Sequence, residues 1–154
     1  MNSMIQSLWT GALRPLLKRP PALQVAALCH RDGDEGVEVL LVTSSSGRWI
    51  LPKGWPIDGM SAGEAAKQEA WEEGGVRKGR LAGVALGSFL TEKRFDNGSV
   101  IPCEIRVYPI DAKSVLDDFP EAHKRDRKWV PIREAANLVD EPGLREMLES
   151  FAAA

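Results

Sequence analysis

The first regular pattern along the chain is a pair of apolar, valine-bearing runs separated by a polar stretch. Residues 23–30 are LQVAALCH and residues 37–43 are VEVLLVT, while residues 31–36 between them are RDGDEG. Short apolar runs on either side of a polar segment that contains glycine are typical of a β-hairpin. The pattern therefore predicts two strands joined by a turn over residues 31–36.

Further extended segments follow along the chain. A short apolar strand is expected at residues 49–51. Two longer extended segments, 81–91 and 100–110, lie on either side of Asn97-Gly98, a dipeptide that strongly favours hairpin turns. The remaining expected elements are a short strand at 128–130 and helices at 132–138 and 144–151.

The middle of the chain carries strong local signals for a helix. Ser61 and Glu64 have the spacing of a capping box, which satisfies two backbone N–H groups at a helix start. Several alanines follow, and Gly74-Gly75 favours a helix end. Strands with one helix inserted centrally and others at the end predict an α+β fold, with a mixed sheet between helices.

Length and composition are those of one globular domain. The chain has 154 residues, of which 44% are hydrophobic and 27% are charged, and this is enough to bury a substantial core. We expect a single domain over residues 22–154, preceded by a basic, amphipathic N-terminal arm over residues 1–21. The arm is expected to pack on its own domain or on a second subunit, which leaves a homodimer open, or to be loosely ordered. Contact with a membrane surface is the minority alternative for the arm.

The net charge and the cysteine content indicate which classes of binding partner and which cellular compartment to expect. The formal net charge is −2, so no global field attracts nucleic acid or an anionic membrane. No apolar segment is long enough for a signal-peptide core or a transmembrane span. Cys29 and Cys103 lie in apolar runs and are expected to be reduced core residues. We therefore expect a cytoplasmic protein with no membrane partner and no nucleic-acid partner.

Three carboxylates on the central helix are the candidate chemistry. Glu69, Glu72 and Glu73 fall within roughly one third of the helix circumference, where like charges repel one another. An ordinary solvated helix face is the alternative. The short strand and the glycine loop at residues 49–54 favour a site for a hard divalent ion, because Mg²⁺ prefers carboxylate and carbonyl oxygens.

These residues resemble the Nudix box, Gly-x5-Glu-x7-Arg-Glu-U-x-Glu-Glu-x-Gly-U, in which U is a bulky apolar residue. The spacing from Gly54 to Val76 agrees throughout. The matching residues are Gly54, Glu69, Glu72, Glu73, Gly75 and Val76. Three positions depart from the box: Met60 replaces its first Glu, Gln68 replaces the Arg, and Ala70 is a small version of the apolar residue.

The Nudix resemblance implies a fold, a reaction and a metal site. The fold is an α/β/α sandwich with a mixed β-sheet and a central box helix. The reaction is hydrolysis of a phosphoanhydride bond by a MutT-like enzyme, in a nucleoside diphosphate linked to another moiety or in a related diphosphate, with Mg²⁺ or Mn²⁺. The implied metal ligands are Glu69, Glu73, the main-chain carbonyl of Gly54, and Glu72 through a second ion or a water. Such cations offset the phosphate charge that repels an incoming water.

The general base has two sources in the family. One is the box helix, here Glu72 or Glu73, and the other is a later glutamate, here Glu92, Glu104 or Glu121. The sequence does not choose between these sources, and the three box glutamates together are the candidate catalytic residues.

The departures from the box raise an alternative function. In the family the Arg orients the first helix carboxylate, whereas Gln68 can donate a hydrogen bond but carries no charge. Met60 removes a loop carboxylate. These changes favour reduced metal affinity and suggest a non-catalytic Nudix module that binds a nucleotide as a regulator. The three retained glutamates argue against that alternative.

The chain also resembles one branch of the family, the diphosphoinositol polyphosphate and diadenosine polyphosphate hydrolases. The resemblance rests on RWILPKG at residues 48–54 and on the basic run HKRDRKWV at 123–130. Basic side chains are suited to extra phosphates, and a solvated loop is the equal alternative. The candidate substrate-binding residues are Arg48, Lys53, Lys93, Arg94, Lys124 and Arg125. Ala22 and Gln24 stand where the eukaryotic relatives place basic residues, so a dinucleoside polyphosphate or another nucleotide stays open.

Removal of pyrophosphate from RNA 5′ ends is a further alternative. It would favour a broad basic surface and aromatic side chains that stack on bases. The chain has one Tyr and an acidic balance, which disfavours it. Trp55, directly after the box glycine, is suited either to stacking on a base or to packing its loop. The expected partner is therefore a small-molecule polyphosphate substrate.

Overall fold

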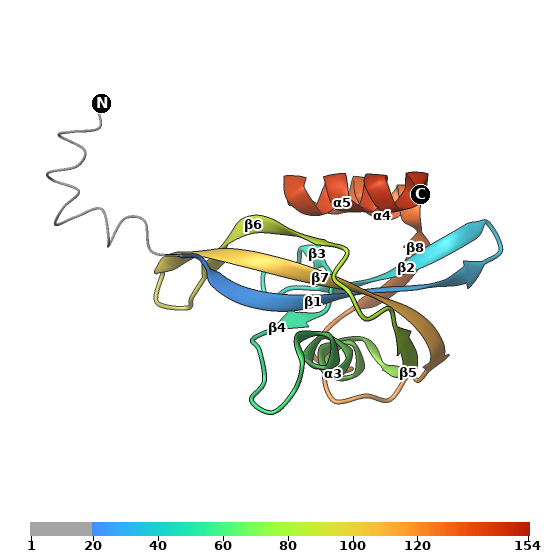
Figure 1. The fold of residues 1–154 in the computed structure, drawn as a ribbon, viewed down its shortest axis with the longest axis horizontal. Helices are drawn as coiled ribbons and strands as arrows, with labels where there is room; N and C mark the ends of the chain where they lie inside the picture. Colours follow the sequence, from blue (N-terminus) through green and yellow to red (C-terminus); the bar gives the residue numbers. More distant parts are fainter. Residues whose placement is uncertain (1–19) are drawn as a thin grey trace, which may run out of the picture.

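The computed structural model of the protein describes residues 20–154, in which eight strands form one mixed sheet (Figure 1). The strands are β1 (Ala22–Gly33), β2 (Gly36–Thr43), β3 (Trp49–Ile50), β4 (Lys53–Gly54), β5 (Val76–Leu81), β6 (Gly87–Arg94), β7 (Val100–Val115) and β8 (Arg127–Pro131). The sheet order is β3-β2-β1-β7-β5, with β4 paired to β1, β6 to β7 and β8 to β2. The central pair, β1 and β7, is parallel, and the other pairs are antiparallel.

Helices cover both faces of this sheet. Helix α3 (Ala62–Gly74) lies on one face, and α4 (Ile132–Leu138) and α5 (Pro142–Ala153) lie on the other (Figure 1). Because side chains alternate along a strand, Val25 and Cys29 of β1 join the core under α3, while Leu28 joins the core under α4 and α5. Because β1 is buried on both faces, its sequence is a nearly continuous apolar run. The expected α/β/α sandwich with a mixed sheet is confirmed.

The first hairpin is tighter than the sequence pattern predicts. Strands β1 and β2 pair as far as Gly33 and Gly36, so the turn is Asp34-Glu35 and not residues 31–36. Arg31 and Glu38 face each other across the two strands, and Arg31 Nε donates to Glu38 Oε1 at 3.0 Å. A cross-strand ion pair allows polar residues to continue the strand pairing. The polar character of residues 31–36 therefore predicted a longer turn than the structure has.

The expected single extended segment over residues 81–91 is wrong, because β5 and β6 are separate strands with residues 82–86 between them. Both pair with the long strand β7: β6 with residues 100–107 and β5 with residues 110–115. Pro109, which has no N–H to donate, lies where β7 changes neighbours, so no ladder bond to β5 or β6 is lost there. The expected turn at Asn97-Gly98 is confirmed, with Gly98 N donating to Phe95 O at 2.9 Å.

The ends of α3 agree with the sequence signals. Ser61 Oγ accepts from Glu64 N at 3.2 Å, and Glu64 Oε1 accepts from Ser61 N at 3.0 Å, which completes the capping box. Gly75 ends the helix with a φ of 77°, a left-handed conformation that glycine adopts without strain. Helix α4 has the predicted bounds, and α5 begins two residues before the predicted start, at Pro142.

The two cysteines are buried and free, as expected, and lie on opposite faces of the sheet. Burial raises the pKa of the Cys29 thiol to about 12. Over residues 20–154, no helix is long and apolar enough to cross a membrane. Residues 1–19 lie outside the described part of the chain, so the expected division into an arm over 1–21 and a domain over 22–154 stays a prediction.

Candidate functional site

The contact between Gly54 and Glu69 joins the two ends of the box. Strand β4 pairs with β1, with Gly54 opposite Val25, and this pairing holds the glycine loop beside α3. A Cβ atom on Gly54 would lie 2.5 Å from Cδ and Oε2 of Glu69. The Glu69 carboxyl group therefore rests on the Gly54 backbone, and a side chain at position 54 would displace it from this position.

Glu73 is the buried member of the site, with 5% of its surface exposed. Its Oε1 accepts from Lys53 N at 3.2 Å, and its Oε2 lies 3.3 Å from Arg125 Nη2. Burial raises the pKa of Glu73 to about 8, although Arg125 and the Lys53 N–H act in the opposite direction. Burial also raises the pKa of Glu69, and the pKa values of Glu69 and Glu73 depend on each other, since the two carboxyl groups lie one helical turn apart on α3. Two desolvated carboxyl groups so close together favour either a shared proton or a bound cation.

Glu72 has different neighbours. Gln68 Nε2 donates to Glu72 Oε2 at 2.6 Å, one helical turn apart on α3. The main-chain oxygen of Glu72 accepts from Glu121 N at 2.9 Å. The structure thus joins Glu69 to Glu73 and turns the Glu72 carboxylate toward Gln68.

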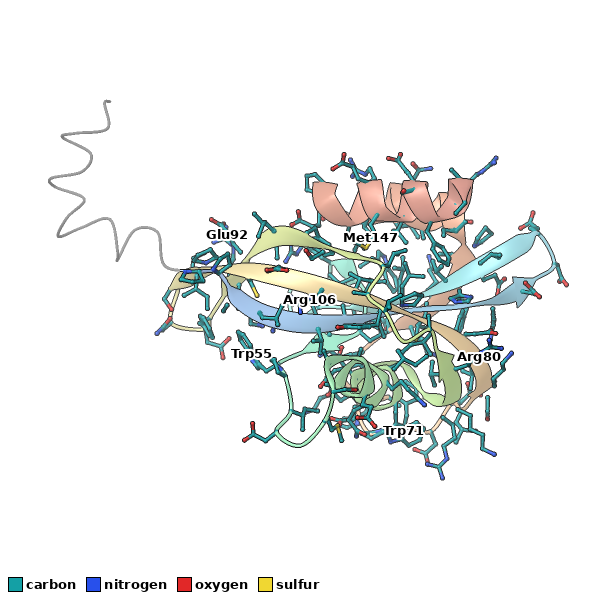
Figure 2. The ribbon with its side chains drawn as sticks, in the orientation of Figure 1. Trp55, Trp71, Arg80, Glu92, Arg106 and Met147 are labelled. Atoms are coloured by element: carbon teal, nitrogen blue, oxygen red, sulfur yellow. The ribbon has the colours of Figure 1, made fainter. Side chains whose placement is uncertain are left out.

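Of the three later glutamates, Glu121 is the one that reaches this site. Arg125 Nε donates to Glu121 Oε1 at 2.8 Å, and the negative charge of Glu121 contributes to the raised pKa values of Glu69 and Glu73. Glu104 lies 3.5 Å from Arg106, and Glu92 lies on β6, away from α3 (Figure 2), where it lines a small pocket with Arg48 and Lys53. No local pattern marks Glu121, because its place depends on the segment between β7 and β8 folding onto the end of α3.

The carboxyl groups of the site fit a hard divalent cation through two ligands and not through three. Within residues 20–154, no three His, Cys, Asp or Glu side chains are arranged together as a ready ligand set. Glu72 is held by Gln68, which leaves Glu69 and Glu73 as the joined pair. Mg²⁺ usually binds through one or two carboxylates and completes its shell with waters and substrate phosphates. The Glu69–Glu73 pair beside the Gly54 loop matches that chemistry.

Three of the candidate substrate-binding residues gather near one another. Lys53 Nζ donates to Gln24 Oε1 at 3.1 Å. Burial lowers the pKa of Lys53, and the positive charges of Lys93 and Arg48 lower it further. We call Arg48, Lys53 and Lys93 the basic cluster. The negative charge of Glu73 acts on the Lys53 ammonium and raises its pKa, so the cluster lies within electrostatic range of the carboxylate site.

The other candidates lie differently. Arg94 is exposed and lies 3.9 Å from Glu92, and Lys124 is exposed. Arg125 is turned inward, and besides its two carboxylates its Nη1 donates to Thr43 O at 2.7 Å. Arg127 Nη1 donates to Gly74 O at the end of α3, where positive charge is favourable. Arginines of the basic run are thus used within the fold, and substrate contact by Lys124, Arg125 and Arg94 stays a prediction.

Trp55 does not pack into the core. It follows Gly54 directly, is 43% exposed, and lies at the loop before α3 (Figure 2). An exposed aromatic ring beside the glycine loop is available for stacking.

The fold and site together define a class: an α/β/α sandwich whose central helix, entered from a glycine loop, carries desolvated carboxyl groups against that loop. The chain belongs to the Nudix family, because the family profile described as NUDIX domain matches residues 20–151.

Individual relatives agree with this assignment. The chain is 34% identical over 116 residues to "Nudix hydrolase 16, mitochondrial" of Arabidopsis thaliana, and the aligned region covers 73% of this chain and 63% of that protein. It is 35% identical over 120 residues to "Diphosphoinositol polyphosphate phosphohydrolase 3-beta" of Bos taurus, and here the aligned region covers 75% of this chain and 68% of that protein. The chain thus spans less than two thirds of the length of the plant relative. Because that relative is named as mitochondrial, the expected cytoplasmic location of this chain stays a prediction.

A solved structure shows the same fold. The Ap4A hydrolase of C. elegans superposes with a TM-score of 0.66 over 87% of this chain and 98% of that chain. The two sequences are 19% identical, so this likeness concerns the fold.

Proposed function

We propose that this chain hydrolyses a phosphoanhydride bond in a small polyphosphorylated molecule and requires a divalent cation, Mg²⁺ or Mn²⁺. Membership of the Nudix family supports the reaction class. The observation that carries the proposal is the joined pair Glu69 and Glu73 beside Gly54, where burial disfavours two uncompensated negative charges.

Each site residue then has a role. Glu69, Glu73 and the main-chain carbonyl of Gly54 would hold the cation, and Glu72 would contribute through a second ion or a water. When bound, the cation offsets phosphate charge and acidifies a water. Lys53 and Arg125 orient Glu73 from either side through its two oxygens. Glu72 and Glu121 are the groups available to take the proton of the attacking water, since neither belongs to the Glu69–Glu73 contact.

The basic cluster supports a substrate with several phosphates. Arg48, Lys53 and Lys93 lie within electrostatic range of the carboxylate site, so phosphates beyond the scissile bond would meet positive charge. The exposed ring of Trp55 favours a substrate that also carries a base. A dinucleoside polyphosphate is therefore the first candidate. A diphosphoinositol polyphosphate is the second, because the basic cluster suits it and a relative is named for that activity.

A substrate panel with a phosphate readout tests this function. We expect hydrolysis of diadenosine polyphosphates or of a diphosphoinositol polyphosphate in Mg²⁺ or Mn²⁺, no hydrolysis in excess chelator, and recovery when the metal is restored. An RNA with a 5′-triphosphate belongs in the same panel as the competing substrate class. Full activity in excess chelator would contradict the proposed mechanism.

A matched pair of glutamate variants locates the site. Glu73→Gln removes a negative charge without changing volume and should lower kcat by about a thousandfold or more, with the fold retained by circular dichroism. Glu64→Gln makes the same change on the same helix, at a capping residue that Gln can replace, and should keep turnover near wild type. Equal activity of the two variants would contradict this division of roles.

A further inference from the structure

An apolar groove follows the open edge of strand β6. Within residues 20–154, β6 pairs with β7 and with no other strand. The groove lies between β6 and α5, has a volume of about 640 Å³, and is lined by Phe89, Leu90, Met147 and Phe151 among others. Met147 points from α5 toward β6 (Figure 2), and Leu90 is 67% exposed. Because proteins usually cover or protect a strand edge, this surface is suited to a covering segment.

The charge of the groove is acidic. Among the residues of the described chain that line it, Glu146 alone is charged. Arg145, the adjacent basic residue of α5, is turned away toward the end of α4, where it donates to Ala136 O at 3.1 Å and to Val139 O at 2.7 Å. A segment that is apolar on one side and basic overall would complement this groove.

The N-terminal arm has that chemistry in its sequence. Residues 1–19 include Arg14, Lys18 and Arg19 and no acidic residue. Apolar residues recur at every fourth position in two series, Met4, Leu8 and Ala12, and Ile5, Trp9 and Leu13. At a helical period these side chains share one face, and Pro15 ends the pattern.

The arm joins the domain close to the groove. Strand β1 begins at the end of the sheet where β6 and β7 are joined (Figure 1). Ala22 and Thr91 lie opposite Cys103 on the two sides of β7. Two strand spacings, about 10 Å, therefore separate the start of β1 from β6.

The length of the arm also matches the groove. Residues 15–19 would span about 16 Å when extended, which is more than the distance to β6. Residues 4–14 would form a helix about 16 Å long, and residues 86–90 on the strand side of the groove span about 14 Å. The arm can therefore reach the groove and fill it.

We propose that residues 4–14 bind in this groove of the same chain, with their apolar face on Phe89, Leu90 and Met147 and with the basic side chains of the arm toward Glu146. The bound arm covers the open edge of β6. The groove and α3 lie on opposite faces of the sheet, so this inference does not rest on the proposed function.

A spin label on the full chain locates the arm. Ser7→Cys places the label on the polar side of the arm, and the native Cys29 and Cys103 are buried, so the label should attach at position 7. In the isotope-labelled protein, amide signals of β6 and of residues 143–154 should be broadened, and those of α3 should keep their intensity. Broadening that spares β6 and α5 would overturn the proposal.

A mixed sample separates binding within one chain from binding between copies. Isotope-labelled protein without the spin label is mixed with unlabelled protein that carries it. Its β6 and α5 signals should keep their intensity. Broadening in the mixed sample would overturn binding within the chain and assign the groove to the arm of a second copy.

A matched pair of groove variants tests the apolar contact. Leu90→Asp places a charge in the groove at an exposed position and should abolish the broadening of α5. Val84→Asp makes a similar change in the loop between β5 and β6, at a position that is 73% exposed and does not line the groove, and should keep the broadening. Unchanged broadening in Leu90→Asp would overturn the proposed contact.

A second pair tests the charge. Glu146→Lys should weaken the broadening of β6. Glu149→Lys makes the same change on α5 at a residue that faces Arg133 and Asn137 and does not line the groove, and should leave the broadening as in wild type. Equal broadening in the two variants would overturn the role of Glu146.

Discussion

At the scale of single residues, the site depends on the close approach of the Glu69 carboxyl group to the Gly54 backbone, which a Cβ atom at position 54 would disturb. The Glu69 carboxyl group occupies the space where a side chain at position 54 would begin. At position 54 the space beside the glycine Cα is what matters. The requirement is therefore steric, and it links the loop directly to a proposed metal ligand.

A pair of glycine variants tests this requirement. Gly54→Ala should displace the carboxyl group of Glu69, which is the movable end of a half-buried side chain, so most activity should be lost while stability changes little. Gly87→Ala is the control, because its Cβ would meet the flexible end of Met147 at 3.4 Å and its φ is not positive. Urea unfolding and kcat/KM measure both effects. A Gly54→Ala protein as active as Gly87→Ala would contradict the steric explanation.

At the scale of elements, His30 connects β1 to the C-terminal helix. Its ring lies 5.4 Å from that of Phe151 on α5, measured between centroids. Burial lowers the pKa of His30 from its usual 6.5, while Asp111 and Asp32 raise it and Lys113 lowers it. The net direction is downward, so packing against α5 favours the neutral imidazole.

This shift predicts a pH dependence of stability. Because the pKa is lower in the folded state, the unfolded chain binds the proton first as the pH falls. The contribution of His30 to stability is therefore present above pH 6.5 and is lost as the pH falls through the folded pKa. The free energy of unfolding, measured in urea from pH 8 to pH 5, should decrease more in wild type than in His30→Gln. Identical decreases would show that His30 does not cause the effect.

At the scale of the whole molecule, the fold gathers charges that are far apart in the sequence. Arg48 precedes β3, Lys53 begins β4 and Lys93 lies near the end of β6, yet their charges act on one another. Clustered cations beside the carboxylate site meet the charge of a long phosphate chain better than that of a short one. Salt should weaken this attraction, because the screening length is about 8–10 Å at physiological ionic strength.

Substrate length tests the basic cluster. In an Arg48→Ala, Lys93→Ala double variant, kcat/KM for diadenosine polyphosphates should fall more steeply as the phosphate chain lengthens, and wild-type KM for long substrates should rise more with salt. A Lys78→Ala, Arg80→Ala variant removes the same charge from β5, where Arg80 lies at the far end of the molecule from Glu92 (Figure 2). It should behave like wild type. A loss that is independent of phosphate number would remove the cluster from the substrate site.

The features that the sequence determined by itself are local or periodic. The capping box at Ser61 and Glu64, the helix end at Gly75 and the turn at Asn97-Gly98 involve neighbouring residues, so their chemistry acts whatever the rest of the chain does. The apolar run of β1 reflects burial on both faces, and the α+β class follows from the order of such runs. The box spacing likewise placed Glu69 and Glu73 on one helix turn.

Only the tertiary structure decided the contacts between distant segments. The separation of β5 from β6 depends on β7 being long enough to pair with both, which no local pattern shows. The internal partners of Arg125 and Arg127 are such contacts, because the fold brings carboxylates and main-chain oxygens from other segments to the two guanidinium groups. Glu121 enters the site by the same route. A side chain's partner is set by which surfaces are buried together, and that is a property of the whole chain.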